Sequence, residues 1–352
     1  MFNNPNIFSL ILVSIFSLSK GYKASGTIVK SSNFNAITDA QTLNTALAGF
    51  GTKDKVVIGV ICGRTNYERQ LIASEYNRLF GRSLHKHIAS DTSGNYGDLM
   101  DALMVPSAEF DASLIKKSIK GFGTDFELLI EVMLTRTPRQ MAATNQAYSA
   151  LYKKDMADDI KGDVNRDVQD LLVRLIEGKR DQSNTVNLEM AKKDAQSLNQ
   201  AGLAKIGGTN MEVFINILTT RNYEQLAKTF EEYEILTKVS MEKTIESEMS
   251  GKIKTAFLVL VECIQSPSGF FARKLHKALK ITFENIQKGI LGGTNEEALI
   301  RIFVTRSEVD MVQIKQDYQK IYKTPLETHL RHDVSRYFQD ALVALLQGNR
   351  KN

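Results

Sequence analysis

Apolar residues recur along most of this chain at the spacing of a helix that buries one face. Two examples are the stripe Val56, Val57, Val60 and Ile61 and the stripe Leu71, Ile72, Tyr76, Leu79 and Phe80. Apolar residues three and four positions apart lie on one side of an α-helix, so both stretches predict amphipathic helices. Only five prolines occur, and Leu, Ile, Ala, Lys, Glu and Gln are frequent throughout. The pattern therefore predicts an all-α protein.

Between residues 35 and 106 the pattern predicts five helices. The first runs from Ala40 to Ala48 with Asp39 as its cap, and a glycine-rich loop ends it. Thr52 is a natural N-cap for the second helix, and the third carries the longer of the two apolar stripes. The fourth helix runs from Leu84 to Ala89, a turn covers residues 90–94, and the fifth helix runs from Tyr96 to Val105. Five helices and two loops make one unit.

Four copies of this unit occur along the chain. Gly-x-Gly-Thr occurs at residues 49–52 and 121–124, and weaker copies end at Thr209 and Thr294. Each Thr is followed by Arg after 12 residues, Tyr after 24 and a carboxylate after 39. These residues are Arg64, Arg136, Arg221 and Arg306; Tyr76, Tyr148, Tyr233 and Tyr318; and Asp91, Asp163, Glu248 and Asp333. The Thr-to-Thr spacings of 72, 85 and 85 residues exceed the usual solenoid periods of about 20 to 50 residues, so each repeat is a small helical bundle.

The repeats divide the chain into segments. We place repeat 1 at residues 35–106, repeat 2 at 107–178, repeat 3 at 191–266 and repeat 4 at 267–348, with a polar linker at 179–190. Residues 20–34 read as a flexible N-terminal segment. Residues 1–19 carry no charge and include a 12-residue apolar run, Ile7–Leu18, which predicts a cleaved secretory signal peptide. An uncleaved anchor or an amphipathic tail is the alternative, because no Lys or Arg precedes the run.

Composition narrows the classes of function. The net charge of +5 suits an acidic surface as partner, but the basic residues are scattered, so nucleic acid is not predicted. Cys62 and Cys263 lie in apolar helical stretches and are predicted to be buried free thiols. The metalloprotease, Walker, nucleophile-elbow and dinucleotide motifs are missing, so enzymatic activity is not predicted. A transition-metal site at His85 and His87, or at His329 and His332, is a minor alternative.

The glycine loops and the acids both lie at helix ends, where they can emerge on one face of each bundle. Glycine can turn carbonyl oxygens toward a common point, and several carbonyls with one carboxylate are the hard oxygen ligands that Ca²⁺ prefers. The predicted ligands are Leu47, Gly49, Gly51 and Asp91 in repeat 1; Ile119, Gly121, Gly123 and Asp163 in repeat 2; Ile206, Gly208 and Glu248 in repeat 3; and Gly289, Leu291, Gly293 and Asp333 in repeat 4.

One carboxylate leaves a bound Ca²⁺ with residual charge and open coordination positions. Such a site is weak alone, in the range of about 10⁻⁴ to 10⁻³ M, and an anionic lipid phosphate supplies what is missing. The alternative is purely structural: the loop is a helix C-cap followed by an N-cap, and the acid caps the fifth helix. Four copies with the acid at a fixed offset favour calcium.

Three more positions of the repeat have predicted roles: the residue between the loop glycines, the repeated Arg and the repeated Tyr. Phe50 and Phe122 sit between the loop glycines, where they either enter the lipid interface or pack on a neighbouring helix. The repeated Arg is expected to bond helix-end carbonyls within its own repeat. The repeated Tyr is expected in the core with its hydroxyl satisfied.

With these loops, the Arg-Thr, Arg-Asn or Arg-Ser pairs and the acids 39 residues after each Thr, the sequence resembles an annexin from about residue 35 to 348. The resemblance implies four five-helix repeats in a slightly curved disc and calcium on its convex face. It also implies reversible binding to acidic phospholipids such as phosphatidylserine. Repeats 1 and 4 would form one half and repeats 2 and 3 the other, around a central polar channel, which places Cys62 and Cys263 in different halves.

Two features depart from the family pattern. Ile206 and Leu291 stand where the first loop glycine is expected, and repeat 3 lacks the loop tryptophan common in the family.

Most annexins lack a signal peptide, so residues 1–19 imply a secreted member. Resemblance to secreted annexin-like proteins of parasites suggests a host-directed effector with a host or extracellular protein partner. A secreted interaction module with relic calcium sites and an ion channel through the disc are the alternatives.

Overall fold

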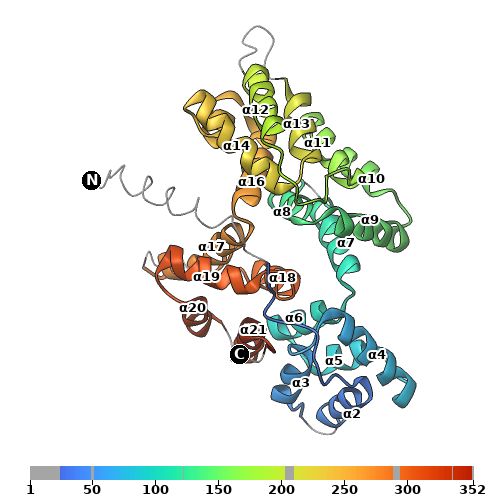
Figure 1. Ribbon diagram of the computed structural model, residues 1–352. Helices are drawn as coiled ribbons and strands as arrows, with labels where there is room; N and C mark the ends of the chain where they lie inside the picture. Colours follow the sequence, from blue (N-terminus) through green and yellow to red (C-terminus); the bar gives the residue numbers. More distant parts are fainter. Residues whose placement is uncertain are drawn as a thin grey trace.

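The computed structural model describes residues 24–48, 51–121, 123–202, 210–287, 294–334 and 336–350. The regular secondary structure in these ranges is helical, which confirms the all-α prediction (Figure 1). The helices follow one another in four groups of five. The first group is α2 (Ala36–Ala46), α3 (Asp54–Ile61), α4 (Asn66–Phe80), α5 (Leu84–Asp91) and α6 (Gly94–Met104), and the second is α7 (Ser107–Ser118), α8 (Phe126–Thr135), α9 (Pro138–Tyr152), α10 (Met156–Asp163) and α11 (Arg166–Glu177).

Repeats 3 and 4 follow the same plan. The third group is α12 (Leu188–Gly202), α13 (Met211–Thr220), α14 (Tyr223–Thr237), α15 (Met241–Glu248) and α16 (Gly251–Gln265). The fourth is α17 (Pro267–Gln287), α18 (Glu296–Arg306), α19 (Met311–Tyr322), α20 (Leu326–Asp333) and α21 (Arg336–Gln347). The residues between α11 and α12 pack against repeat 3, since buried Arg180 donates to the carbonyls of Leu218 and Arg221 at the end of α13.

The caps of the first repeat differ from those predicted. Asn35 caps α2 by accepting from the backbone N–H of Thr38, so the helix begins at Ala36 and not at Ala40. Asp39 lies inside α2, and the N-cap of α3 is Lys53 rather than Thr52. Both predicted caps are therefore wrong, because each side chain has a tertiary partner that propensity alone does not show.

That partner of Asp39 is the repeated arginine. Arg64 binds both oxygens of Asp39, at 2.7 and 3.1 Å. The same pair joins Arg136 to Asp111 in α7 and Arg221 to Asp194 in α12. The arginine is structural, as predicted, but its main partner is a carboxylate of the first helix rather than a helix-end carbonyl.

In repeat 4 the repeated arginine, Arg306, has different partners. Phe271 of α17 lies under the guanidinium of Arg306, with 4.5 Å from the guanidinium carbon to the ring centroid. The carboxylate comes from Asp310, four residues later, at 2.8 and 2.6 Å. Both side chains of this pair are buried. A buried guanidinium needs a paired anion wherever the chain can provide one.

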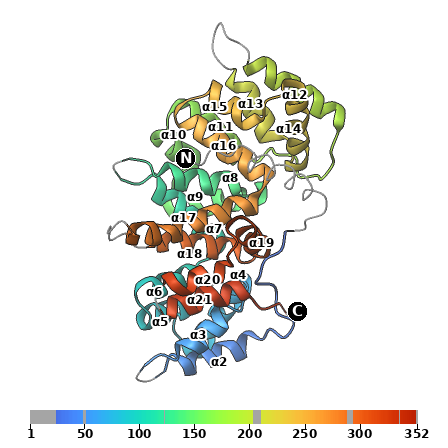
Figure 2. The ribbon, with the colours of Figure 1, turned by 90° about the vertical axis from the view of Figure 1, so that its left-hand side faces the viewer.

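The four repeats pair into two cores. One hydrophobic core contains side chains of repeats 1 and 4, and the other contains side chains of repeats 2 and 3. In Figure 1, α2–α6 and α17–α21 accordingly form the lower half, and α7–α16 form the upper half. Figure 2 shows the two halves stacked in one elongated body. The pairing inferred from the annexin resemblance is confirmed.

One expectation that followed from the pairing is wrong. Cys62 and Cys263 belong to the same core, that of repeats 1 and 4. Cys263 lies in α16, the last helix of repeat 3, which packs on α17, and its side chain thus reaches the other half. Both cysteines are free and buried, as predicted. Burial raises the pKa of the Cys62 thiol to about 12 and also raises that of Cys263, so both stay protonated near neutral pH.

The third helix of repeats 2, 3 and 4 ends at a lysine in the left-handed region. Lys153, Lys238 and Lys323 have φ of 55°, 63° and 58°, whereas repeat 1 has Gly81 there, with φ of 64°. Left-handed backbone costs a residue with a side chain roughly 1–2 kcal/mol, which exceeds the roughly 0.5–1 kcal/mol of flexibility that glycine adds. We expect Lys238→Gly to raise the free energy of unfolding by about 0.5–1 kcal/mol in urea titrations. Gly81→Lys is the reverse exchange and should lower it by a similar amount; an unchanged midpoint in both variants contradicts the argument.

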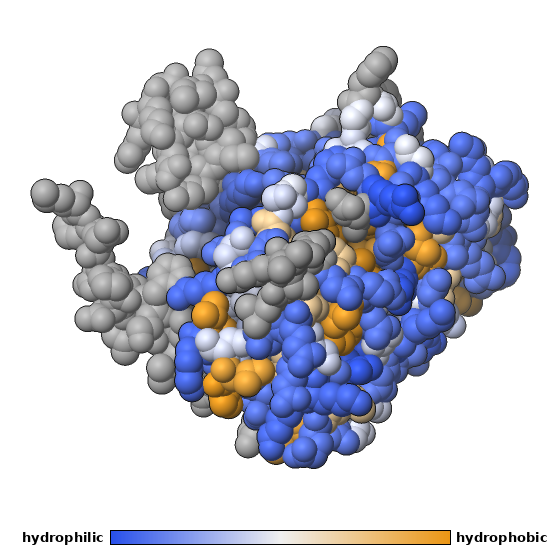
Figure 3. Space-filling view, turned by 90° about the horizontal axis from the view of Figure 1, so that it is seen from above, coloured by the Kyte–Doolittle hydropathy of each residue, from blue (hydrophilic) through white to orange (hydrophobic). Residues whose placement is uncertain are grey.

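The face of the molecule seen in Figure 3 is mostly hydrophilic where its residues are described. Seen from above in Figure 3, apolar residues lie in small groups between hydrophilic ones. Within the described residues, no single helix is both long and apolar enough to cross a membrane. The bent pair Gly251–Gln265 and Pro267–Leu279 meets the length and composition criteria only when taken together.

Candidate functional site

The repeated acid is the last residue of a short helix in all four repeats. The fourth helices α5, α10, α15 and α20 each have eight residues and end at Asp91, Asp163, Glu248 and Asp333. Asp91 thus lies in α5 rather than in the predicted turn, so the helix is longer than predicted. A carboxylate at a helix C-terminus faces the negative end of the helix dipole, which is unfavourable unless a cation is near. A cation bound beside such an acid would remove this penalty.

The acids do not cap the fifth helices. The N-caps of α6, α11 and α16 are Ser93, Asn165 and Ser250, each two residues beyond the acid. The structural alternative for the acids, an N-cap on the fifth helix, is therefore wrong in these three repeats. In these repeats the acid therefore has a role other than capping the fifth helix.

The loop and the acid of one repeat lie in contact, 39 residues apart in the chain. The hydroxyl of Thr52 donates to the carbonyl of Asp91 at 3.4 Å, and that of Thr124 donates to the carbonyl of Asp163 at 2.7 Å. This bond explains why neither threonine caps the helix after it. The sequence singled out each threonine as a fixed point of the repeat but did not reveal this contact.

The described loop glycines have the backbone that the predicted site requires. Gly51, Gly121 and Gly123 have φ of 91°, 107° and 96°, a region that side chains rarely permit. Open space surrounds all three, since nothing lies within 4 Å of a methyl group built on any of them. In the described part of the chain, no hydrogen bond ends on the carbonyls of Gly51, Gly121 or Gly123. Those oxygens are free to bind an ion.

The other predicted ligands divide into two groups. Leu47 and Ile119 lie directly after α2 and α7, with buried side chains, and so stand at the start of their loops. Several predicted residues lie outside the described residues: Gly49, Phe50, Phe122, Ile206, Gly208, Gly289, Leu291 and Gly293. Asp333 ends α20, and Glu248 ends α15 with a 3.4 Å bond from Ser247.

The segment that joins the first two helices differs between repeats 1 and 2 and repeats 3 and 4. In every repeat the N–H after the threonine donates to a carbonyl of the first helix: Lys53 to Ala46, Asp125 to Ser118, Asn210 to Ala201 and Asn295 to Ala278. These bonds enclose 6, 6, 8 and 16 residues. In repeat 4 the enclosed segment includes residues 279–287, the end of α17, so most of its extra length lies in a longer first helix. The longer spacing between Thr209 and Thr294 is the sequence signal for this extension.

Comparison with known proteins places these four repeats in a family. The annexin family model matches residues 38–103, 110–175, 193–260 and 283–345, one match for each repeat. The chain belongs to the annexin family. Annexin A3 of Homo sapiens is 37% identical over 324 residues, covering 92% of this chain and 97% of that protein. Annexin A13 of Canis lupus familiaris is 38% identical over 313 residues, covering 89% and 96%.

Solved annexin structures share the fold. Annexin III superposes with a TM-score of 0.86 at 36% identity, covering 94% of this chain and all of that one. A calcium-bound annexin (Sm)1 superposes with a TM-score of 0.83 at 26% identity, covering 93% and 94%. The resemblance drawn from the loop motifs is confirmed, and the annexin fold of four repeats with it.

The repeated tyrosine of this annexin lies in the core, and its hydroxyl is bonded as predicted. Tyr76, Tyr148 and Tyr318 are fully buried, and Tyr233 is nearly so. Each hydroxyl contacts the residue 11 positions later, which lies four positions before the acid: His87 at 2.7 Å, Asp159 at 2.7 Å, Thr244 at 3.0 Å and His329 at 2.6 Å. The polar residue at this fixed offset was visible in the sequence and was missed.

In repeat 2 the residue that contacts the tyrosine is Asp159, and it makes stability depend on pH. Hydrogen bonds from Lys116 and Tyr148 lower the pKa of Asp159 to about 2, below the value of about 3.9 in an unfolded chain. The stabilisation is therefore complete above about pH 4 and is lost as the pH falls toward about 2. We expect Asp159→Asn to lower the urea midpoint at about pH 7, with the deficit shrinking below about pH 4. Asp158→Asn, on the exposed side of the same helix, should show no deficit at either pH, and a pH-independent deficit for Asp159→Asn contradicts the assignment.

Charged side chains fill part of the junction between the two halves. Arg301 of α18 binds both oxygens of buried Glu131 in α8, at 2.7 and 3.1 Å. Lys274 and Lys277 of α17 lie 3.4 and 3.2 Å from Glu127, and Lys274 is the main cause of that carboxyl's lowered pKa. The charged side chains named here pair with one another across the junction, so this part of it is polar.

The donor set at the loops fits a hard cation. It consists of backbone carbonyls and one carboxylate per repeat, the oxygen ligands that Ca²⁺ uses. Across the described residues, no three His, Cys, Asp or Glu side chains group as a metal site. A site with a single carboxylate does not require such a group.

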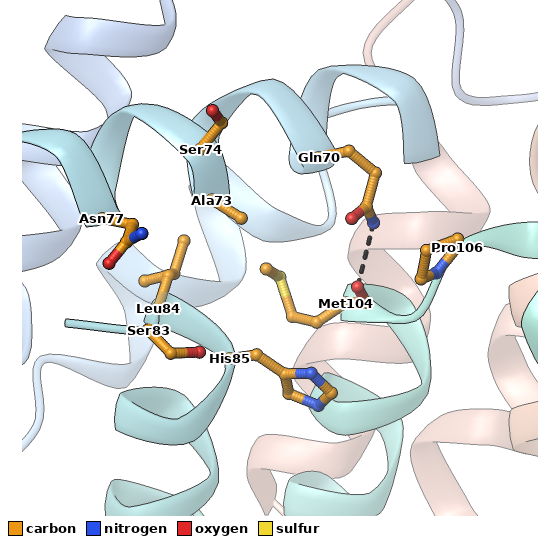
Figure 4. Close-up of a pocket in the computed structure, with 9 residues that line it drawn as sticks. All are labelled: Gln70, Ala73, Ser74, Asn77, Ser83, Leu84, His85, Met104 and Pro106. Carbon is orange, nitrogen blue, oxygen red and sulfur yellow. Dashed lines mark hydrogen bonds between the residues drawn. The ribbon is translucent and has the colours of Figure 1, made fainter. Parts of the chain in front are cut away.

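A separate surface groove of about 340 Å³ lies between α4, α5 and the end of α6. Buried Leu84 and Met104 line it together with the polar side chains of Ser74, Asn77 and His85 (Figure 4). None of the predicted calcium ligands lines this groove. His85, one of the two histidines of α5, faces this groove rather than the predicted calcium ligands.

Proposed function

We propose that this annexin binds acidic phospholipid membranes in a calcium-dependent manner. The observation that carries the proposal is the contact between each glycine loop and its helix-terminal acid in repeats 1 and 2. The carbonyls of Leu47, Gly49 and Gly51 with Asp91, and those of Ile119, Gly121 and Gly123 with Asp163, would hold one Ca²⁺ each. Family membership and the calcium-bound relative of similar fold support the choice of ion.

The mechanism is ion bridging without a catalytic step. Each site supplies one negative charge to a divalent cation, so a lipid phosphate completes both the charge and the coordination. Calcium and lipid then raise each other's affinity by the same factor. Sites on one body that engage the same membrane add avidity. Phe50 and Phe122, which stand between the loop glycines in the sequence, would add apolar contact with the interface.

Repeats 3 and 4 contribute less in this proposal. The segments closed by the equivalent backbone bonds have 8 and 16 residues instead of 6, and the longer one includes the end of α17, so the carbonyl geometry of repeats 1 and 2 is not reproduced by position alone. Ile206, Gly208 and Glu248, and Gly289, Leu291, Gly293 and Asp333, stay the candidate ligands there. Repeats 1 and 2 are expected to dominate binding.

Co-sedimentation with vesicles tests the proposal directly. The chain from Lys20 onward should pellet with phosphatidylserine vesicles at about 1 mM free Ca²⁺, the upper end of the affinity expected for such sites, and stay in solution with a chelator. Phosphatidylcholine vesicles are the control for the need for acidic lipid. Failure to pellet with calcium would favour the alternative, an interaction module that uses the annexin scaffold to bind a protein.

We also propose that residues 1–19 direct export and that the protein acts outside the cell, with a host or extracellular partner. The uncharged apolar run Ile7–Leu18 supports this. Expression of the full chain in secretory cells should yield protein in the medium whose first residue is Lys20. Deletion of residues 2–19 should retain it inside, and full-length protein found only inside cells contradicts the proposal.

A further inference from the structure

The two histidines of α5 point to different sides of the helix. His85 borders the groove in Figure 4, and its Nε2 contacts Asp101 of α6. His87 points instead toward the core and the acid, with a side chain only 14% exposed. Its Nδ1 lies 2.7 Å from the hydroxyl of Tyr76, and its Nε2 lies 3.7 Å from Oδ2 of Asp91. One imidazole therefore connects a buried tyrosine to the helix-terminal acid.

The imidazole is fixed from the core side. Tyr76 is fully buried, and its hydroxyl is also 3.1 Å from Oδ1 of Asn44. Arg82 already donates to that amide oxygen at 2.7 Å. The shorter contact of the hydroxyl is with His87, so we assign the hydroxyl proton to the bond with Nδ1. The imidazole then carries its own proton on Nε2, the nitrogen that faces the carboxylate.

We propose that His87 is a positioning residue for Asp91. The Nε2–H group faces Oδ2 across 3.7 Å, which is longer than a hydrogen bond, while the hydroxyl of Ser90 donates to Oδ1 at 3.1 Å. The electrostatic attraction of Nε2–H for Oδ2 favours one orientation of the carboxylate beside the loop, so that less conformational freedom is lost when it binds a cation. The inference rests on the proposed function, because it treats Asp91 as a calcium ligand. Side chains that orient a metal ligand from outside typically change metal affinity by about 10–100-fold when they are removed.

The other repeats show that the arrangement is specific. At the position of His87, repeat 2 has Asp159, which accepts bonds from Lys116 and Tyr148, and repeat 3 has Thr244, whose hydroxyl contacts Tyr233. Neither side chain has a second donor to offer the acid four residues later. Repeat 4 has His329, with its Nδ1 2.6 Å from Tyr318, and Asp333 follows four residues later. The two histidines thus occur in the repeats that share one core.

Single tryptophans can report each loop separately. The chain contains no tryptophan, so Phe50→Trp and Phe122→Trp place one reporter in the loop of repeat 1 or repeat 2. Tb³⁺, a hard cation that replaces Ca²⁺, emits when a nearby tryptophan is excited, and added Ca²⁺ displaces it. No vesicles are needed, so binding at one loop is not coupled to the other through the membrane.

His87→Thr, which installs the residue of repeat 3, should weaken binding at the Phe50→Trp reporter by about tenfold. The Phe122→Trp reporter should be unchanged. His87→Gln should restore most of the affinity, because its amide N–H can take the place of Nε2–H. His85→Thr is the matched control on the same helix and should change neither reporter. Equal weakening at both loops, or no change with His87→Thr, overturns the positioning role.

A measurement without metal tests the same assignment. At about pH 8, nitrogen-15 spectra of the full chain should show His87 as the Nε2–H tautomer. Asp91→Asn should shift that nitrogen, whereas Asp101→Asn should shift only His85. An Nδ1–H tautomer for His87 contradicts the inference. If Asp91→Asn leaves the Phe50→Trp signal intact, the calcium site itself is wrong; if it abolishes the signal while His87→Thr does nothing, only the positioning role fails.

Discussion

Asp91→Ala combined with Asp163→Ala is expected to abolish calcium-dependent pelleting with phosphatidylserine vesicles at about 1 mM free Ca²⁺. Each aspartate is the only charged ligand proposed for its ion, and the carbonyls that remain cannot offset the cost of removing water from a divalent cation. Because two loops on one body act together through avidity, losing both should cost far more than losing one. Each single variant is expected to raise the calcium needed for half-maximal binding by about tenfold or more.

The control for this experiment must carry the same change of charge. Removing two acids makes the protein more positive, which by itself strengthens attraction to an acidic vesicle. Asp98→Ala with Asp158→Ala removes two exposed carboxylates that are not proposed as ligands, on α6 and α10. This variant should pellet at least as well as the unchanged protein. Normal pelleting of the Asp91 and Asp163 double variant would exclude the proposed lipid bridge and favour the interaction module.

Arg136→Met is expected to lower the free energy of unfolding by about 3–5 kcal/mol. Arg136 and Asp111 are both buried and form two bonds of 2.8 and 2.7 Å between α7 and the end of α8. Burial lowers the pKa of Arg136, but Asp111 and other nearby acids more than offset it, so the net shift is upward and the arginine stays charged. Removing the arginine leaves the Asp111 carboxylate buried without its cation, which is the main cost. Urea unfolding at neutral pH measures the change.

Two comparisons isolate the cause. Arg136→Met with Asp111→Leu removes both charges, and its loss should be much smaller than that of Arg136→Met alone, because apolar pairs can replace buried ion pairs. Lys117→Met breaks the exposed contact between Lys117 and Glu297 and should cost less than about 1 kcal/mol. A double variant as unstable as the single one would mean that packing rather than the unpaired charge explains the loss.

The local pattern was sufficient for the fold. Helical periodicity predicted the all-α class, and four copies of one motif at fixed offsets predicted the repeats, because a repeated unit must bury the same face each time. The same offsets identified Tyr76 and its equivalents as core residues and the four acids as a recurring feature of the surface. These properties depend on residue type and spacing, which the sequence contains in full.

What only the tertiary structure decided concerns partners that are distant in the chain. Asp39 and Thr52 were assigned as caps from local preference, but Arg64 and the carbonyl of Asp91 bind them instead. Cys263 reaches the core of the other half because α16 packs on α17. The contact of His87 with Tyr76 and Asp91 likewise depends on how α4 and α5 meet. Local propensity is worth about 1 kcal/mol at a cap, whereas a buried charge left unpaired costs several, so the long-range contact prevails wherever the fold provides one.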